Sequence, residues 1–243
     1  KTTPEFELEL SHNAISLSQE EREIDQIDAE KLSEPSMSFE SPQWCINNHQ
    51  KWLNSRYEGI TDMLQNNLAE SININNPLLI DSSKGTGQFW LSEWLSSNGI
   101  KATEVSYQAT ALNENCGAGD LSPTQEWTFE EAKQSTHILI KQLPICEPGT
   151  LVAAALDGDG DRCLLIETTS TGFKVIDGDR IADTFVNCVT NSGFEWHLAA
   201  SIESDLSLTT NLERYPKQVR VSETAVGDRW LSFKLSENQK NKI

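Results

Sequence analysis

The segment Leu156–Arg162 constrains this chain more than any other, because its sequence is Leu-Asp-Gly-Asp-Gly-Asp-Arg. Its interior glycines would each cost a helix roughly 1 kcal/mol, so a helix is disfavoured. In a strand, Asp157, Asp159 and Asp161 would place three like charges on one face. A tight loop wrapped around a cation removes this repulsion, and hard carboxylate oxygens suit Mg²⁺, Ca²⁺ or Mn²⁺. The segment therefore predicts a metal-binding loop.

Other interpretations of this loop stay open. An EF-hand would need glycine at its sixth position and glutamate at its twelfth, with helices on both sides. Those positions hold Arg162 and Thr168, and the apolar flanks 151–156 and 163–166 predict strands. An acidic turn without an ion is the remaining alternative, although turns rarely need three aspartates and an arginine together. A phosphatase of the DxDxT type is disfavoured, because the loop contains no threonine.

Charge and composition exclude several classes of function. The 243 residues include 19 lysines and arginines against 37 aspartates and glutamates, which gives a formal net charge of −18. This balance argues against nucleic-acid binding, which needs a basic surface, and against attraction to anionic membranes. No apolar stretch is long enough to span a bilayer, and no signal peptide is visible. We therefore expect neither nucleic acid nor a membrane as a partner.

The five cysteines and four histidines show no metal-ligand spacing. No two cysteines form a CxxC pair, so zinc binding and a disulfide framework are both disfavoured. Scattered cysteines fit a reducing compartment, and we expect a cytoplasmic location. Surface or structural roles are expected for all of the histidines, namely His12, His49, His137 and His197.

Alternating helix and strand patterns predict an α/β fold with mixed β-sheets and flanking helices. Residues 1–40 are expected to be the tail of a preceding domain, with an edge strand and a helix, followed by a linker. Residues 41–177 are expected to form an α/β domain that carries the metal loop. A second, partial α/β domain of similar architecture is expected over residues 178–243.

Individual helices and strands are expected from residue 43 onward. The expected helices cover 43–70, in which Gly59 could break the helix, then 89–97, 128–134, 180–190, 206–215 and 226–235. The expected strands cover 77–81, 101–106, 151–156, 163–166, 196–202 and 218–222, with a hairpin turn at 171–172. Residues 82–87 form a glycine loop. This loop is weak evidence for phosphate binding, because it is neither a P-loop nor GxGxxG, and a strand-to-helix turn is the alternative.

In this context the metal loop resembles that of the α-D-phosphohexomutases. The resemblance rests on segments that follow the family's order: 80–87, 112–118, 156–162, 176–181 and 225–230. The first looks like the opening strand and loop of the family's second domain, and 112–118 is similar to a segment typical of hexosamine-phosphate mutases. Residues 176–181 look like the junction into the third domain. The match covers roughly residues 40 to 235, the central portion of a family member.

The resemblance implies roles for the loop residues. In this family a phosphoserine phosphorylates one end of a sugar monophosphate, and the bisphosphate intermediate reorients and returns a phosphoryl group from its other end. By implication Asp157, Asp159 and Asp161 bind Mg²⁺, and Arg162 is a catalytic residue that contacts the phosphoserine. The implied function is phosphoryl transfer between the 6- and 1-positions of a hexose or hexosamine phosphate. Mg²⁺ and arginine suit this reaction because they neutralise charge on the transferring phosphoryl group.

The resemblance also implies that three residues of the 225–230 loop bind substrate: Gly227, Asp228 and Arg229. The family's nucleophile lies in a loop with the approximate sequence Thr-Ala-Ser-His-Asn-Pro, of which this chain shares Ser-His-Asn at 11–13. Ser11 is therefore one candidate for the phosphorylated serine, and a turn at the end of a strand is the alternative.

Function remains divided between three hypotheses at this level. The first is an enzyme piece that lacks a complete active site, because family members have further domains on both sides of the matched region. The second is a catalytically silent mutase-like protein that keeps the metal loop for binding or regulation. The third, outside the family, is an α/β module that binds a divalent cation.

Overall fold

The computed structural model describes residues 42–64, 77–189, 195–212 and 219–240. The strand, helix and linker expected within residues 1–40, and Ser11 with them, lie outside the described residues. The chain divides into two compact units. One is Glu70–Phe185, and the other combines Val186–Ile243 with Lys1–Ala69.

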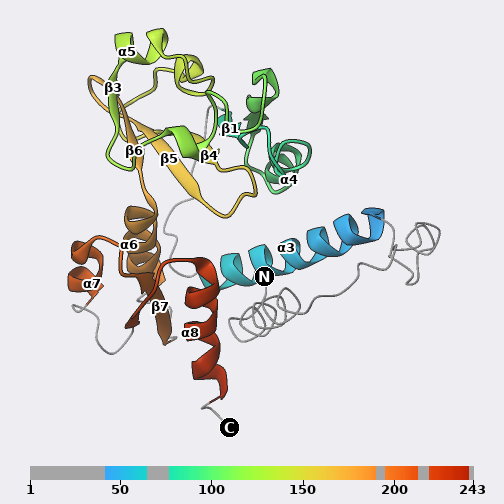
Figure 1. Ribbon diagram of the computed structural model, residues 1–243, viewed down its shortest axis with the longest axis vertical. Helices are drawn as coiled ribbons and strands as arrows, with labels where there is room; N and C mark the ends of the chain where they lie inside the picture. The colour runs from blue at the N-terminus through green and yellow to red at the C-terminus, as the bar shows by residue number, and fades with distance from the viewer. Residues whose placement is uncertain (1–41, 65–76, 190–194, 213–218, 241–243) are drawn as a thin grey trace, which may run out of the picture. The chain divides into compact units, whose positions relative to one another are not determined.

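The unit Glu70–Phe185 is built on a six-stranded mixed sheet with the order β2-β1-β4-β5-β6-β3 (Figure 1). β1 pairs in parallel with β2 and with β4, whereas β4 with β5, β5 with β6, and β3 with β6 are antiparallel pairs. The strands are β1 (Leu78–Asp81), β2 (Ala102–Glu104), β3 (Glu126–Thr128), β4 (Leu151–Leu156), β5 (Cys163–Thr168) and β6 (Gly172–Ile176). The mixed α/β fold expected from the sequence is confirmed.

Both faces of this sheet are buried, which explains the continuous apolar run of β4. Neighbouring residues of a strand point to opposite faces. Ala153 and Ala155 accordingly belong to one core cluster, whereas Ala154 packs with Leu78 and Ile80 in another. A strand that is covered on both faces has no need of alternating polar residues, so its pattern is apolar throughout.

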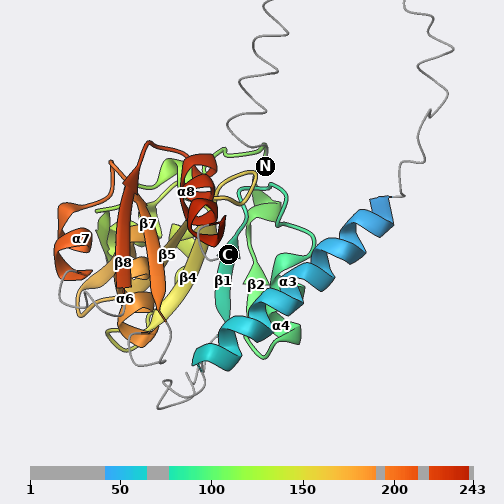
Figure 2. The same ribbon diagram turned by 90° about the horizontal axis from the view of Figure 1, so that it is seen from below.

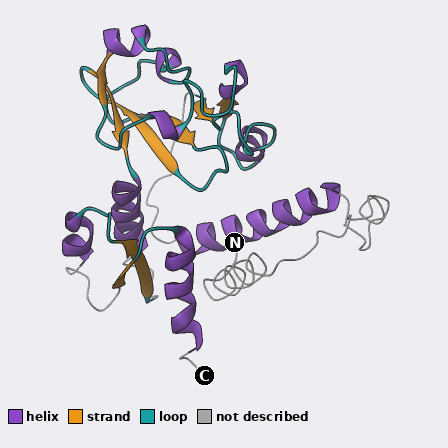
Figure 3. Ribbon diagram, viewed as in Figure 1, coloured by secondary structure: helices purple, strands orange, loops and turns teal. Residues whose placement is uncertain are grey.

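Helices cover the two faces of the sheet (Figure 3). Leu91 and Leu95 of α4 pack against the cluster that contains Ala154, and Ala132 of α5 lies in the opposite cluster. The helical segments of this unit are α4 (Leu91–Ser97), α5 (Phe129–Gln134) and the short 3-10 turns η1 (Ser106–Gln108), η2 (Ala118–Asp120) and η3 (Ile140–Gln142).

The second unit contains a two-stranded parallel sheet of β7 (Trp196–Ser201) and β8 (Val219–Thr224). Its register runs from Trp196 opposite Val219 to Ser201 opposite Thr224. α8 packs against both strands and α7 packs against β8 (Figure 2). The helices are α3 (Pro42–Leu64), α6 (Gly178–Val189), which crosses the boundary between the units, α7 (Leu206–Leu212) and α8 (Asp228–Lys240). Within the described ranges, no helix is long and apolar enough to cross a membrane.

The differences from the expected elements have identifiable causes. α3 continues through Gly59, since a lone glycine costs a helix only about 1 kcal/mol. α4 begins at Leu91 rather than at Phe89, because the preceding residues form hydrogen-bonded turns. β3 was not expected, because its three residues are too few to show a strand pattern. β3 exists through its pairing with β6.

Candidate metal centre

The predicted metal loop is the turn of the hairpin that β4 and β5 form. Strand pairing ends at Leu156 opposite Cys163, and the backbone N–H of Asp157 donates to the Arg162 carbonyl at 3.3 Å. The N–H of Gly160 donates to the Asp157 carbonyl at 3.1 Å. Gly160 has a φ of +77°, a conformation that glycine adopts without steric cost. The sequence Asp-Gly-Asp-Gly-Asp therefore forms a compact turn at the carboxyl end of β4.

The three aspartates of this turn converge. Asp157, Asp159 and Asp161 each offer a carboxylate oxygen, and these oxygens lie within 4.8 Å of one another. Asp157 is buried, whereas the other two are exposed. Hard oxygen ligands stand about 2.0 to 2.6 Å from Mg²⁺ or Ca²⁺, so this spacing fits a single divalent cation.

Asp157 is also the residue that holds the loop in shape. Its Oδ1 accepts hydrogen bonds from the backbone N–H groups of Asp161 at 3.0 Å and Arg162 at 3.1 Å. Its Oδ2 accepts from the Arg162 Nε at 2.8 Å. Burial on its own would raise the pKa of Asp157, but these hydrogen bonds and the Arg162 charge hold that pKa at about 2. The carboxylate is therefore ionised at neutral pH, as a metal ligand must be.

Arg162 is fixed by Asp157 and still accessible. The bond to Asp157 orients the guanidinium, while 69% of the Arg162 side-chain surface remains exposed. The same bond, together with the nearby aspartates, raises the pKa of Arg162 above its usual value. A permanently charged, oriented guanidinium beside a cation site is suited to an anionic group such as a phosphate.

The glycine loop after β1 lies against the metal loop. Thr86 N–H donates to the Gly158 carbonyl at 2.9 Å, and the Ser83 hydroxyl donates to the Leu156 carbonyl at 2.8 Å. A Cβ at Gly85 would stand only 2.0 Å from the Gly158 carbonyl oxygen. β1 and β4 are parallel, so both loops occupy the carboxyl edge, where open α/β sheets bind ligands.

The segment 112–118 joins the same edge. Asn113 N–H donates to the Ser83 carbonyl at 3.1 Å, and a Cβ at Gly158 would lie 3.0 Å from Leu112 Cδ1. Asn113 has a φ of +57°, a conformation that asparagine tolerates better than most residues. Three segments that are far apart in the sequence and carry the family resemblance (80–87, 112–118 and 156–162) thus meet around the metal loop.

Sequence reasoning missed Asp81, which is fully buried at the end of β1. Its carboxylate accepts from the backbone N–H groups of Ser83 at 2.9 Å and Gly117 at 2.7 Å. Burial raises the pKa of Asp81, while these two hydrogen bonds act in the opposite direction. The only available signal was an aspartate that directly follows three apolar strand residues, Leu78–Ile80.

The expected substrate residues lie elsewhere in the chain. Gly227 directly precedes α8, Asp228 is the first residue of that helix, and Arg229 follows. Gly227 has a φ of +113°, and its carbonyl accepts from Trp230 N–H at 3.0 Å. The Arg229 guanidinium carbon lies 5.4 Å from the centre of a Trp230 ring. These residues belong to the second unit, so their contact with a substrate stays a prediction.

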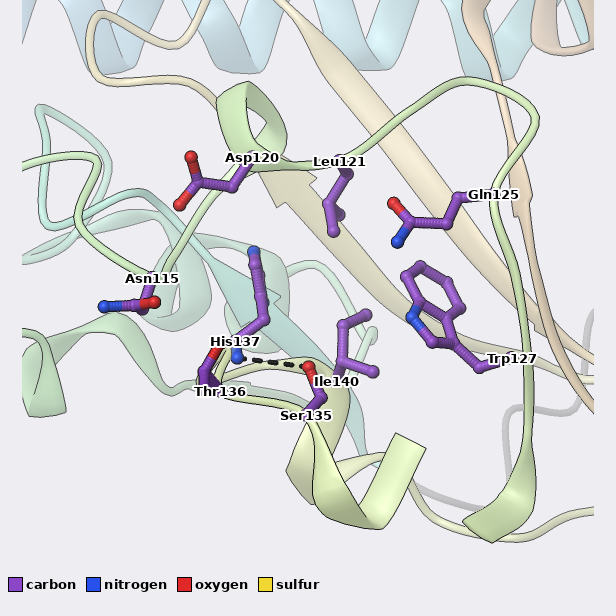
Figure 4. Close-up of a pocket in the computed structure, with 9 residues that line it drawn as sticks. All are labelled: Asn115, Asp120, Leu121, Gln125, Trp127, Ser135, Thr136, His137 and Ile140. Carbon is purple, nitrogen blue, oxygen red and sulfur yellow. Dashed lines mark hydrogen bonds between the residues drawn. The ribbon is translucent and has the colours of Figure 1, made fainter. Parts of the chain in front are cut away.

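A separate polar cavity of about 350 Å³ lies in the unit Glu70–Phe185 (Figure 4). It is lined by Asn115, Asp120, Leu121, Gln125, Trp127, Ser135, Thr136, His137 and Ile140. No lysine or arginine is among these residues, and neither is any residue of the metal loop. The cavity therefore lacks the permanently charged side chains that commonly bind a phosphate group.

Comparison with known proteins identifies partial relatives. No family model matches the chain. A phosphoglucosamine mutase of Lactobacillus gasseri is 26% identical over 228 residues, which cover 91% of this chain and 44% of that protein. One of Corynebacterium jeikeium is 27% identical over 169 residues, which cover 67% of this chain and 33% of that protein. Relatives of this kind support the resemblance that the five segments indicated.

A solved structure was also found. The apo-form of an N-acetylglucosamine-phosphate mutase from the α-D-phosphohexomutase superfamily aligns with a TM-score of 0.49 and 20% identity. This alignment covers 75% of the present chain and 35% of the solved one. The chain thus spans less than half the length of the curated relatives that it matches, between 30% and 44%.

Proposed function

Given that the chain resembles the α-D-phosphohexomutases, and among them the phosphoglucosamine mutases, we propose that it forms part of such an enzyme. The reaction would move a phosphoryl group between the 6- and 1-positions of a hexose or, in closer accord with the relatives, a hexosamine phosphate. The observation that carries the proposal is the convergence of Asp157, Asp159 and Asp161 beside Arg162 at the carboxyl edge of the sheet. The complete activity is proposed for a protein with further domains, and we expect this chain alone to lack it.

Mg²⁺ is the cation that we propose for the loop. Asp157, Asp159 and Asp161 would hold it, and when bound it would neutralise charge on a transferring phosphoryl group. Asp157 already accepts three hydrogen bonds within the loop, so this one of the three proposed ligands is oriented by the chain itself. Because Mg²⁺ keeps several waters when protein ligands are few, we expect weak binding by the isolated loop.

Arg162 is proposed to hold the phosphate of the active-site phosphoserine. Its guanidinium is oriented by Asp157 and presents a charge that no physiological pH removes. The phosphorylated serine itself is proposed to lie in a preceding domain or at Ser11. Storage of a phosphoryl group between two transfers needs such a nucleophile, since a cation and an arginine can only stabilise charge.

Substrate contacts are proposed for Gly227, Asp228 and Arg229. They stand where α8 begins, and the N–H groups of a helix start favour anionic oxygens. We further propose a cytoplasmic location, which the scattered cysteines and a phosphorylated sugar substrate both suit.

A coupled mutase assay tests the proposal. The substrates are glucosamine 6-phosphate and N-acetylglucosamine 6-phosphate, with Mg²⁺ and a catalytic amount of sugar bisphosphate. We expect turnover by the protein that the complete reading frame encodes, a large loss of turnover in Asp159→Asn, and no turnover by residues 1–243 alone.

Two other results of this assay would contradict parts of the proposal. If the complete protein binds Mg²⁺ but turns over neither these substrates nor glucose phosphate, the silent mutase-like alternative replaces the enzyme. Turnover by residues 1–243 that disappears in Ser11→Ala would identify Ser11 as the nucleophile and show that the chain is more complete than proposed.

A further inference from the structure

Asp81 is a fully buried carboxylate to which the proposed mutase reaction gives no role. Its Oδ1 accepts the N–H of Ser83 in the loop after β1, and its Oδ2 accepts the N–H of Gly117 in the 112–118 segment. Ser83 is 2 positions and Gly117 is 36 positions from Asp81 in the sequence. Asp81 therefore ties two loops of the carboxyl edge to the end of one strand.

Ser83 connects Asp81 to the metal loop. Its hydroxyl donates to the carbonyl of Leu156 at 2.8 Å, and Leu156 is the residue directly before Asp157. Ser83 has a φ of +55°, a conformation that residues other than glycine keep only when their surroundings hold them there. The bond from Ser83 N–H to Asp81 is one of the contacts that hold it.

Gly117 packs against Ser83 from the other side. A Cβ at Gly117 would lie 1.4 Å from the Ser83 Oγ and 2.7 Å from the Leu156 carbonyl oxygen. The peptide groups of Gly117 are held at both ends, its N–H by Asp81 and its carbonyl by the Nε2 of His137 at 3.1 Å. The Ser83 hydroxyl thus has little room to leave the Leu156 carbonyl while Asp81 holds Gly117 in place.

His137 lies beside the Asp81 carboxylate. Its side chain is 8% exposed, and its Nδ1 lies 4.0 Å from the Asp81 Oδ2. That Nδ1 has no hydrogen-bond partner among the described residues. His137 also stands in the wall of the polar cavity (Figure 4). His137, for which a surface or structural role was expected, thus lies next to the carboxylate that holds the two loops of this edge.

We infer that Asp81 is a positioning residue for the metal loop, acting through Ser83 and Gly117 on the Leu156 carbonyl and so on the direction of Asp157. The inference rests on the proposed cation site at Asp157, Asp159 and Asp161. Groups that orient metal ligands commonly change metal affinity by 10–100-fold when they are replaced.

Mn²⁺ binding to residues 1–243 tests this role. The variants are Asp81→Asn, which replaces one acceptor oxygen by a donor, and Ser83→Ala, which removes only the hydroxyl that contacts Leu156. Asp120→Asn, an exposed aspartate of the same unit, is the matched control. Free Mn²⁺ is measured by electron paramagnetic resonance. We expect affinity to fall about tenfold or more in the two variants and to stay within about twofold in the control.

Two further readouts separate positioning from a general loss of stability. Water-proton relaxation per bound Mn²⁺ should rise in Asp81→Asn and Ser83→Ala, because a misplaced ligand leaves an extra water on the ion. Hydrogen exchange of the Gly160, Asp161 and Arg162 amides should accelerate, while the paired amides of β5 keep their protection. Unchanged affinity, relaxation and loop exchange in both variants would overturn the inference.

The outcomes also distinguish this inference from the proposed function. If the unsubstituted chain binds no Mn²⁺, the metal proposal is wrong, and loop exchange still decides whether Asp81 positions the loop. If Asp81→Asn does not fold, the Mn²⁺ affinity and the loop hydrogen exchange of Ser83→Ala test the inference instead. This variant leaves the buried Asp81 carboxylate and its two amide partners intact.

Discussion

Replacing Gly85 with alanine tests whether the loop after β1 and the metal loop pack backbone against backbone. A Cβ at position 85 would stand 2.0 Å from the Gly158 carbonyl oxygen and 2.7 Å from its carbonyl carbon and Cα. Carbon atoms in contact normally lie about 3.5 to 4.0 Å apart. Backbone atoms cannot rotate away as a flexible side chain can, so the two loops must separate.

The expected cost follows from two contributions. Overpacking in a close-packed region costs typically about 1 to 3 kcal/mol. Separation also breaks the hydrogen bond from Thr86 N–H to the Gly158 carbonyl, which contributes about 0.5 to 1.5 kcal/mol net. We therefore expect Gly85→Ala to lower the free energy of unfolding of this unit by about 1.5 to 4.5 kcal/mol. Because Gly158 lies between Asp157 and Asp159, cation affinity should fall as well.

Native-state hydrogen exchange of the β1 and β4 amides is the suitable assay. The chain has two compact units, so a global denaturation midpoint would mix their transitions, whereas strand amides report the unit that contains them. Gly119→Ala is the control, since a Cβ there meets no atom within 4 Å. We expect the control to change stability by less than about 0.5 kcal/mol. A Gly85→Ala effect as small as that of the control would refute the close approach of the two loops.

Three predictions concern groups outside the metal loop. Thr128→Ala removes the side chain that accepts from Glu131 N–H at the start of α5 and should cost about 1 kcal/mol, measurable by exchange of the α5 amides. The N–H and hydroxyl of Thr128 lower the pKa of Glu131, so the stabilisation from that contact is complete above the ordinary glutamate pKa and is lost as pH falls through the lowered value. Thr128→Ala keeps the backbone N–H, which lowers the Glu131 pKa most, so nuclear magnetic resonance titration should show this pKa rise only part of the way toward normal, and an unchanged pKa would contradict the hydroxyl contact. Burial raises the pKa of Cys116 to about 11, so iodoacetamide at pH 8 should label its thiol only on unfolding, whereas rapid labelling of the native chain would contradict its burial.

The convergence of the three aspartates could be predicted from the sequence because it depends on local spacing. Asp157, Asp159 and Asp161 are separated by single glycines, and the same short turn that forms the hairpin brings their carboxylates together. The strand before the loop was predictable for a similar reason. Leu151–Leu156 is apolar throughout, and such a run is typical of a strand that is buried on both faces.

The parts that were missed depend on contacts between distant segments. Asp81 accepts a hydrogen bond from Gly117, which is 36 positions away in the sequence, and no local sequence pattern near either residue predicts that contact. Gly85 is explained by the carbonyl of Gly158, which no local pattern could reveal. β3 is a strand only because β6 lies beside it. Local spacing thus predicted that the three aspartates share one turn, whereas the contacts of Asp81 and Gly85 with distant segments needed the structure.

Calorimetric titration of residues 1–243 with Mn²⁺ tests the central claim most directly. We expect one ion per chain and a loss of affinity of about tenfold or more in Asp159→Asn, because ligand charge sets the affinity of a carboxylate site. Asp159 is exposed, so the isosteric substitution should leave the fold intact, and Asp120→Asn should bind as the unsubstituted chain does. Equal binding by the unsubstituted chain and Asp159→Asn, or no binding by either, would contradict the assignment of the 157–161 loop as a metal site.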